Sequence, residues 1–112
     1  MLNPNDQAGK NITAYGLNHH TADAALREKY AFSPEETLAA LADCRVAIGA
    51  SEIALLSTCN RSEIYAVGGD AGQLARWLAA HKHTTPDALE TLTFHYRDRD
   101  AIRHIYRVAS GL

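Results

Sequence analysis

Apolar residues alternate with polar ones in some segments of this chain and recur at helical spacing in others. Alternation over residues 12–18, which include β-branched and aromatic side chains, predicts a strand. Short apolar runs at residues 52–57 and 63–67 predict two further strands, with a polar loop at 58–62 between them. A shorter run at residues 92–96 also favours a strand. The pattern therefore predicts four strands.

Helical spacing and capping residues predict the helices of the first half of the chain. Apolar positions in residues 22–32 recur at helical spacing, and Thr21 is a candidate N-cap. The run Ser-Pro-Glu-Glu at residues 33–36 combines a capping serine, a proline at the first helical position and a glutamate that closes a capping box. Gly49 is the expected stop of this second helix. Its expected apolar face consists of Leu38, Leu41 and Ala42.

The second half of the chain predicts three more helical segments. After a turn at residues 68–70, apolar residues follow the spacing of an amphipathic helix, at Ala71, Leu74, Ala75, Leu78 and Ala79. Thr85 and Pro86 start a short helical turn, and residues 98–109 are again helical. The apolar stripe expected for this last helix consists of Ala101, Ile102, Ile105 and Ala109, with Val108 at its edge.

The order of these elements is β, α in two pieces, β, β, α, β, α, which is a βαββαβ unit followed by a trailing helix. We therefore expect an α+β fold of the ferredoxin-like type, with a mainly antiparallel sheet that helices cover on one face. The polar residues 1–11 predict a flexible tail, and residues 12–112 predict one folded domain.

Composition and charge narrow the class of protein. With 112 residues, of which 46% are hydrophobic and 21% charged, the chain has the composition of one soluble globular domain. A formal net charge of -2 excludes the strongly basic surface that tight, non-specific binding of nucleic acids requires. The sequence has no apolar run long enough for a membrane span and no apolar stretch at its start, so we expect a cytoplasmic protein.

Cys59 is the first candidate for chemistry, because it lies in the polar loop between two strands, where a rigid sheet can present a side chain to a ligand. Thr58 and Asn60 are hydrogen-bonding neighbours, and the guanidinium of Arg61 favours a nucleophilic thiolate. The alternative is a buried, inert thiol, which is what we expect of Cys44 in its helix. The two cysteines form no CxxC pair and have no histidine at zinc-finger spacing, so we expect no metal site.

His104 and a group of polar residues around His19 are further candidates. His104 lies just beyond the apolar stripe of its helix, a border position that suits an imidazole exchanging protons near neutral pH, or a half-buried structural histidine. Asn18, His19 and Thr21 lie where the first strand gives way to a helix, a frequent place for ligand contacts. They are candidates for lining a substrate site, and the alternative is a simple turn with an N-cap.

Four motifs together resemble, in order and spacing, the N-terminal catalytic domain of the glutamyl-tRNA reductases. They are GLNHHTA at 16–22, REKYAF at 27–32, LSTCNRSEIY at 56–65 and HIYRVASGL at 104–112. The resemblance spans about residues 12–112, and STCNR is its most specific part.

The resemblance implies an oxidoreductase that uses NADPH to reduce glutamate esterified to its tRNA to glutamate-1-semialdehyde, the first committed step of tetrapyrrole (heme and chlorophyll) synthesis. In the family, the cysteine of STCNR attacks the aminoacyl ester to form a thioester, which hydride then reduces; this role falls on Cys59. Substrate-binding roles fall on Thr58, Asn60 and Arg61. The histidine required for activity matches His104.

The chain departs from the family pattern at two places. Asp23 stands where the family commonly has proline, and because Asp is favourable at the start of a helix we expect no loss. The sequence ends after RVASGL and contains no GxGxxG, so we expect the NADPH-binding and dimerisation domains to be absent and no cofactor to bind these residues.

The partners implied by the resemblance are glutamyl-tRNA(Glu), a second copy of the chain in a homodimer formed through a domain outside these residues, and, as a candidate, the next enzyme, glutamate-1-semialdehyde aminomutase. We expect no membrane partner. Arg61 has the shape to hold a substrate carboxylate through two parallel hydrogen bonds, which would select glutamate over glutamine.

Without a hydride source, these residues could at most form or hydrolyse the thioester. One alternative is therefore a thioesterase or acyl transferase that releases glutamate to water. Another is a non-catalytic ferredoxin-like regulatory or protein-binding module, in which Cys59 and His104 are packing residues. If both residues serve one catalytic site, the sulfur and the imidazole should face one cleft within roughly 10 Å of each other.

Overall fold

The computed structural model describes residues 11–111, in which four strands form one sheet in the order β2-β3-β1-β4. The strands are β1 (Ile12–Asn18), β2 (Glu52–Ser57), β3 (Arg61–Val67) and β4 (Phe94–Arg97). All three neighbouring pairs are antiparallel. Strand β3, which follows β2 directly in the chain, lies between β2 and β1, as a ferredoxin-like βαββαβ unit requires. The expected fold class is confirmed.

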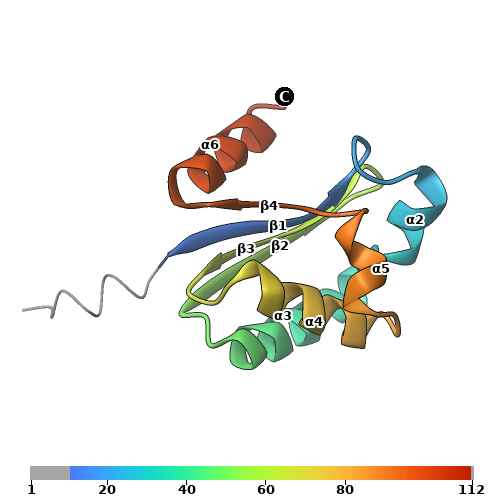
Figure 1. The fold of residues 1–112 in the computed structure, drawn as a ribbon, viewed down its shortest axis with the longest axis horizontal. Helices are drawn as coiled ribbons and strands as arrows, with labels where there is room; N and C mark the ends of the chain where they lie inside the picture. The colour runs from blue at the N-terminus through green and yellow to red at the C-terminus, as the bar shows by residue number, and fades with distance from the viewer. Residues whose placement is uncertain (1–10, 112) are drawn as a thin grey trace, which may run out of the picture.

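Helices cover both faces of this sheet. Figure 1 shows α3 and α4 beneath one face, while α6 crosses the opposite face above β1 and β4. The sheet is thus enclosed between the helices of the βαββαβ unit and the trailing helix. The helices are α2 (Ala24–Lys29), α3 (Pro34–Ile48), α4 (Ala71–His81), α5 (Pro86–Glu90) and α6 (Asp98–Ala109).

The hydrophobic core lies between the sheet and helices α3 and α4. We call the side of the sheet that faces these helices the core face. Its buried side chains come from alternate positions of the central strands, as expected for residues that share one face of a sheet. They are Tyr15 and Leu17 of β1 and Ile64 and Ala66 of β3, packed with Ala40, Cys44 and Ile48 of α3 and Leu74, Trp77 and Leu78 of α4.

Helix boundaries follow local capping signals, as the sequence indicates. Ser33 forms a capping box with Glu36 at the start of α3, and Gly49 ends that helix in the left-handed conformation at φ 69°. Asp70 caps α4 and Thr85 caps α5. The bounds of α6 coincide with the predicted residues 98–109.

The cap of the first helix is a correction. Asp23, not Thr21, accepts the hydrogen bond from the Leu26 amide at the start of α2. The hydroxyl of Thr21 instead accepts from the amide of Asn18, and so closes the turn that precedes the helix. The helix therefore begins at Ala24, two residues later than the spacing indicated.

The apolar face expected for α3 is wrong at two of its three residues, and only Leu41 is half-buried. Leu38 is 80% exposed and Ala42 is also exposed, whereas Ala40, Cys44 and Ile48 face the core. The small Ala40 and Cys44 allow the helix to approach Trp77, whose indole N–H donates to Asp43 across the α3–α4 contact at 2.8 Å. Size and fit to α4, rather than hydrophobicity alone, decide which side of α3 is buried.

Two strand boundaries also differ from the prediction. Strand β3 begins at Arg61, so Arg61 and Ser62 lie in the strand and the β2–β3 connection contains only residues 58–60. The amide of Thr58 donates to the Arg61 carbonyl at 2.7 Å and makes this connection tight. Strand β4 covers Phe94–Arg97 instead of residues 92–96, because its pairing with β1 begins at Phe94 opposite Gly16.

The expected tail at 1–11 lies, except for its last residue, outside the described residues. Asn11 is held in place, since its side chain donates to Thr13 and Gly69 and its carbonyl accepts from Gly68. Within residues 11–111, no helix has the length and apolar character to cross a membrane.

The backbone of β3 lies so close to Gly16 of β1 that a side chain there would not fit, and this leads to a stability prediction. A Cβ at this position would lie 2.2 Å from the Ser62 carbonyl oxygen and 2.7 Å from Cα of Glu63. We expect Gly16→Ala to lower the free energy of unfolding by about 1–3 kcal/mol, the usual cost of overpacking, as measured by urea denaturation.

Gly72→Ala in α4 is the matched control, because the nearest atoms there belong to the side chains of Asp70 and Arg76, at 3.2 and 3.5 Å. We expect this control to stay within about 1 kcal/mol of the wild type. Equal effects of the two substitutions would show that β1 and β3 can separate at Gly16 without cost.

Candidate functional site

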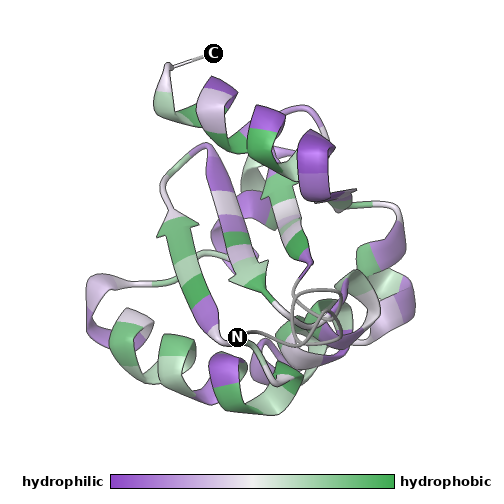
Figure 2. Ribbon diagram, turned by 90° about the vertical axis from the view of Figure 1, so that its left-hand side faces the viewer, coloured by the Kyte–Doolittle hydropathy of each residue, from purple (hydrophilic) through white to green (hydrophobic). Residues whose placement is uncertain are grey.

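A polar side of the sheet lies opposite the core face. Because cross-strand partners share a face, the register pairs Asn18 with Arg61, Gly16 with Glu63 and Ala14 with Tyr65 on this side. We call it the polar face, and α6 covers it. In Figure 2 the ribbon of α6 alternates between hydrophilic and hydrophobic bands, as expected for a helix with one side on the sheet and one in solvent.

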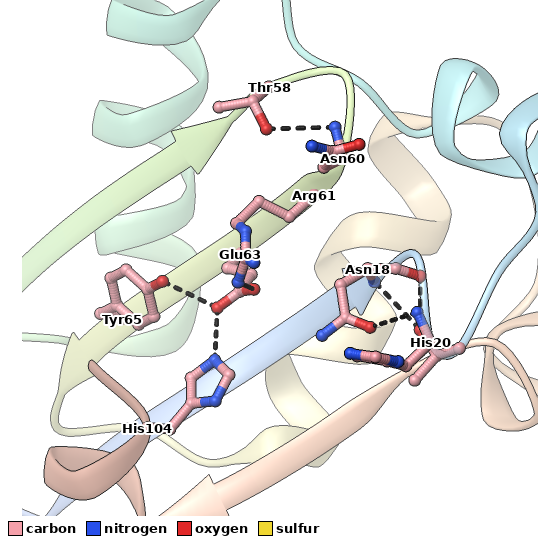
Figure 3. A network of polar contacts seen from close by, with 9 residues as sticks. Asn18, His20, Thr58, Asn60, Arg61, Glu63, Tyr65 and His104 are labelled. Atoms are coloured by element: carbon pink, nitrogen blue, oxygen red, sulfur yellow. Dashed lines mark hydrogen bonds and ion pairs between the residues drawn. The ribbon is translucent and has the colours of Figure 1, made fainter. Parts of the chain in front are cut away.

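Glu63 is the centre of a hydrogen-bonded network on the polar face. Its side chain is fully buried, and Arg61 Nη1 donates to its Oε2 at 2.7 Å. Its other oxygen, Oε1, accepts from the Tyr65 hydroxyl at 2.7 Å and meets His104 Nε2 at 2.6 Å. Figure 3 shows these three side chains converging on the carboxylate. Each oxygen of a fully buried acid therefore has a partner, as buried polar groups require.

His104 reaches this network from α6. Its side chain is 14% exposed, and its ring packs against Phe94 and Tyr96 of β4, with ring centroids 4.9 and 5.0 Å away. The expected border position of His104 is confirmed. The expected apolar stripe of α6 is confirmed only in part, because Ala101 is fully buried and Ile105 is half-buried, whereas Ile102 is 42% exposed and Ala109 is exposed. Contact with Glu63 and β4 turns the His104 side of the helix toward the sheet.

The chemistry of the network assigns the protons. A carboxylate oxygen only accepts hydrogen bonds, so Nε2 of His104 is the donor to Glu63, and Nδ1 is the ring nitrogen that Glu63 leaves to another partner. No hydrogen bond within residues 11–111 involves Nδ1. Tyr65 stays protonated, because burial and its hydrogen bond to the Glu63 carboxylate raise the pKa of the phenol.

A hollow of about 440 Å³ opens beside this network, between α6, the end of β1 and β4. We call it the α6 hollow. Six of its side chains are arginine or histidine, and one is a carboxylate. Its lining consists of Asn18, His19, His20, Arg61, Tyr96, Asp100, Arg103, His104, Arg107 and Val108.

The turn after β1 contributes to the hollow, partly as expected. The carbonyl of Asn18 accepts from the amides of Thr21 and Ala22, and its side-chain oxygen accepts from the His20 amide at 2.9 Å. Asn18 and His19 line the hollow, but His20 takes the place that was expected for Thr21. The His19 pKa lies below its ordinary value, chiefly because of the neighbouring His20.

Cys59 occupies the exposed tip of the β2–β3 connection. Asn60 donates its amide to the Thr58 hydroxyl at 3.2 Å, and Arg27 of α2 donates Nε to the Cys59 carbonyl at 3.2 Å and Nη1 to Ala22. The loop is therefore held from within and from α2.

Cys59 and His104 do not line the same hollow. Cys59 lines a second one of about 550 Å³, the α2 hollow, together with Thr58, Asn60, Arg27 and other residues of α2 and its flanks. Among the residues described, the expected single cleft is thus divided in two. Asn60 borders one hollow and Arg61 the other, so adjacent residues connect them.

The sequence pattern alone did not identify Glu63, Tyr65 or Arg27. A usable signal existed for the first two, since Arg61, Glu63 and Tyr65 occupy every second position of a strand and so must share a face. No local signal places Arg27 beside Cys59, 32 residues away in the sequence. Cys44 is buried as expected, and burial raises its pKa to about 12.

The arrangement offers an exposed thiol, a fixed guanidinium and an oriented imidazole around adjoining hollows. Such groups suit attack on an acyl group carried by an anionic substrate. Within residues 11–111, no group of three or more His, Cys, Asp or Glu side chains is placed to hold a metal ion.

Comparisons with known proteins show the family of the chain. The family model described as "Glutamyl-tRNAGlu reductase, N-terminal domain" matches residues 15–112. A glutamyl-tRNA reductase of Marinobacter nauticus is 46% identical over 103 residues, which are 90% of this chain and 24% of that protein. One from Dichelobacter nodosus is 44% identical over 101 residues, again 90% of this chain and 24% of that protein.

A solved structure has the same fold. The glutamyl-tRNA reductase from Methanopyrus kandleri superposes with a TM-score of 0.67 and 34% sequence identity, over 90% of this chain and 22% of that one. The chain spans about a quarter of the length of the curated relatives it matches. On the family match, the sequence identity and the shared fold, this chain belongs to the glutamyl-tRNA reductase family and corresponds to its N-terminal domain.

Proposed function

We propose that this chain binds the glutamyl group of glutamyl-tRNA and forms a thioester with it on Cys59, as the catalytic part of a glutamyl-tRNA reductase. One observation carries the proposal. The exposed thiol of Cys59 lies two residues from Arg61, whose guanidinium shares the buried Glu63 carboxylate with His104. The nucleophile lies in the turn before β3, the anion-binding group lies in β3, and the proton-exchanging group of α6 is hydrogen-bonded to β3.

In the proposed step, the deprotonated sulfur of Cys59 attacks the carbonyl carbon of the ester that joins glutamate to the terminal ribose. The carbon–sulfur bond forms, the carbon–oxygen bond to the ribose breaks, and the released ribose oxygen takes up a proton. If water then attacks the thioester, the products are glutamate and the free thiol. Thr58 and Asn60 bind the substrate from the same turn, and Asn18 and His19 line the neighbouring hollow.

Arg61 is proposed to hold the side-chain carboxylate of the glutamyl group. Only its Nη1 is occupied by Glu63, so the remaining donors of the guanidinium are available to an anion in the α6 hollow. The charge of Arg61 would favour glutamate over glutamine, and its planar fork would favour a carboxylate over other anions.

His104 is proposed to act through Nδ1, the ring nitrogen that Glu63 leaves free. From this position Nδ1 can first take up a proton, which makes the ring an imidazolium, and then donate that proton to the released ribose oxygen, or it can orient the ester. The Glu63 carboxylate would stabilise the imidazolium in this role, as the aspartate does in a Ser-His-Asp triad.

NADPH is the proposed reductant of the whole enzyme, but the residues here do not fit it. The sequence has no GxGxxG, and every strand pair among residues 11–111 is antiparallel, so these residues form no βαβ crevice for a dinucleotide. No reduction step is therefore assigned to them.

The remaining proposals follow from family membership. They are a cytoplasmic location, a homodimer formed through other parts of the protein, and glutamate-1-semialdehyde aminomutase as a partner. The exposure of Cys59 argues against a non-catalytic module, because a cysteine that serves only packing is buried, as Cys44 is. Without a hydride source, the activity proposed for these residues alone is hydrolysis of the thioester.

Thiol accessibility supplies a direct prediction. We expect one mole of iodoacetamide to label each mole of folded protein at pH 7, on Cys59, and a second to add only after unfolding. Cys44 is buried and its pKa of about 12 keeps the thiol protonated. The measurement is peptide mass spectrometry with and without urea. Equal labelling of both cysteines in the folded protein would contradict it.

Deacylation of glutamyl-tRNA tests the function itself. We expect the wild type to release free glutamate and to carry acid-stable label from glutamyl-tRNA, independently of NADPH, and Cys59→Ser to lose both. Cys44→Ala is the matched control and should retain activity. Equal rates for wild type and Cys59→Ser, without label on the wild type, would refute Cys59 as the nucleophile in this chain.

Glu63→Gln tests the network. The amide keeps the shape but can donate to Nε2, which favours the other tautomer of His104 and leaves the Arg61 charge unbalanced. We expect deacylation to fall more than tenfold, and two-bond ¹⁵N–¹H NMR of the imidazole to show a change of tautomer.

Tyr65→Phe is the comparison for this test. It removes one hydrogen bond from the carboxylate but keeps the charge, so we expect a smaller loss of deacylation than in Glu63→Gln. We expect the free energy of unfolding to fall by about 0.5–1.5 kcal/mol. An unchanged tautomer and rate in Glu63→Gln would show that the carboxylate has no positioning role.

A further inference from the structure

The outer side of β2 is an open edge of the sheet. The strand order is β2-β3-β1-β4, so β3 pairs with one side of β2, and no strand among residues 11–111 pairs with the other. In Figure 2 this strand, at the left end of the sheet, is hydrophobic over most of its length. Natural sheets protect such edges with proline, charged side chains or bulges. Residues 53–57 contain neither proline nor a charged residue. The edge is therefore open to pairing with another strand.

Backbone groups of three residues point out of this edge. The Thr58 amide donates to the Arg61 carbonyl. Hydrogen-bonded pairs of an antiparallel ladder occur at every second residue, so from there on alternate residues of β2 bond to β3. The amides and carbonyls of Ile53, Leu55 and Ser57 then face away from β3, and we call these three residues the β2 edge. Within residues 11–111 these backbone groups have no backbone partner.

One side of α3 extends this edge on the core face. Leu41 lines a narrow apolar cleft together with Ile53 and Leu55. Arg45 Nε donates to the backbone carbonyl just before β2 at 3.4 Å. Leu38 precedes Leu41 by three residues and Arg45 by seven, so it lies on the same side of the helix. Leu38, which is 80% exposed, is therefore an unpaired apolar side chain beside the β2 edge.

The backbone of the β2 edge is complementary to a second copy of itself. When two copies pair antiparallel with Leu55 opposite Leu55, Ile53 of each copy lies opposite Ser57 of the other. Residues that point outward then meet only residues that point outward. Every free amide of the edge donates to a free carbonyl of the other copy, as an antiparallel ladder requires. A shift by one residue would break this match.

Side chains and charges fit the same pairing. On the polar face, the exposed Ala54 of one copy lies opposite the half-buried Leu56 of the other, which is an apolar pair. On the core face, a twofold axis at Leu55 brings the two α3 helices together through the side that carries Leu38. Glu52 is the only charged residue of β2, and the two copies of it lie at opposite ends of the strand pair, so like charges do not meet.

We propose that a second copy of this chain adds its own β2 to the β2 edge, so that two four-stranded sheets join into one continuous antiparallel sheet. Both copies use the same surface, which makes the interface twofold and closed. The proposal does not depend on the function proposed for Cys59. The homodimer proposed above forms through other parts of the protein, so this contact is a separate interface. One strand pair and one side of a helix make a small interface, and we expect a dissociation constant in the micromolar range.

Sedimentation velocity of the full chain tests the proposal. The protein is measured from about 1 to 500 µM, a range that brackets micromolar association. A reducing agent prevents disulfide formation through the exposed Cys59. We expect the wild type to pass from monomer to dimer in this range. Ala54→Lys should raise the dissociation constant at least about tenfold, because a lysine blocks edge pairing and a twofold interface contains it twice.

Val46→Lys is the matched control. Val46 is 80% exposed, as Leu38 is, but it lies two residues from both Cys44 and Ile48 and therefore on the side of α3 opposite the core. It makes the same charge change as Ala54→Lys, and we expect it to dimerise like the wild type. Leu38→Lys should weaken the dimer. Thermal melting checks that all variants fold.

Hydrogen exchange followed by NMR reads the strand pairing directly. In the monomer, the outward amides of Ile53, Leu55 and Ser57 are free and should exchange rapidly. In the dimer they are hydrogen-bonded, so their exchange should slow as the protein concentration rises. The amide of Leu56, which faces β3, should be protected at every concentration.

Three outcomes would overturn the proposal. The first is a wild type that stays monomeric up to the highest concentration. The second is an equal effect of Ala54→Lys and Val46→Lys, which would point to general charge repulsion or to the outer side of α3. The third is a dimer in which the Leu55 amide still exchanges rapidly, since its interface would then lie elsewhere on the chain.

Discussion

The buried carboxylate of Glu63 is the group on which the rest of the site depends. A fully buried acid without partners is strongly destabilising, and removing one partner of a buried ion pair typically costs about 3–5 kcal/mol. Arg61, Tyr65 and His104 supply the partners, and the last of these comes from α6. The same contacts that satisfy the charge therefore dock the trailing helix on the sheet. Gly16 completes the constraint, because only a residue without a side chain lets β1 lie close against the backbone at Glu63.

This arrangement separates a rigid part of the site from a reactive part. Arg61 and His104 are fixed by a buried network, whereas the thiol of Cys59 lies exposed on a connection of three residues. Hydrogen bonds from Arg27 and within the turn hold the backbone of that connection without covering the sulfur. Reactive groups are often presented in this way, on a short loop positioned by a rigid sheet. The two hollows thus differ in character, with cationic side chains lining the α6 hollow and the exposed thiol lining the α2 hollow.

Some arginine side chains stabilise the fold through ion pairs, whereas others are available to bind a ligand. The charge of Arg61 serves both, since Glu63 uses one of its nitrogens and leaves the others to the α6 hollow. Arg103 and Arg107 have no structural partner among the described residues, so their charge is available to a ligand. A chain with a net charge of -2 can in this way present a locally cationic surface. Attraction of an anion then depends on where a few arginines lie and not on overall composition.

The sequence by itself determined the features that depend on neighbours in the chain. Ser33 and Gly49 mark the ends of α3 through local hydrogen bonds and a left-handed turn, and the alternation and order of the elements predicted the ferredoxin-like sheet. Four motifs, of which STCNR is the most specific, predicted the family, and the burial of Cys44 was predicted correctly, whereas for Cys59 a buried thiol remained an alternative.

Only the tertiary structure decided the features that need contacts between distant segments. Leu38 and Ile102 are apolar but exposed, because packing against Trp77 and bonding to Glu63 set the rotation of α3 and α6. The pairing of Glu63 with His104 spans 41 residues, and that of Arg27 with Cys59 spans 32. Local patterns specify which side chains share a face of one element, but burial of a charge or exposure of a thiol depends on what the other elements bring to that face.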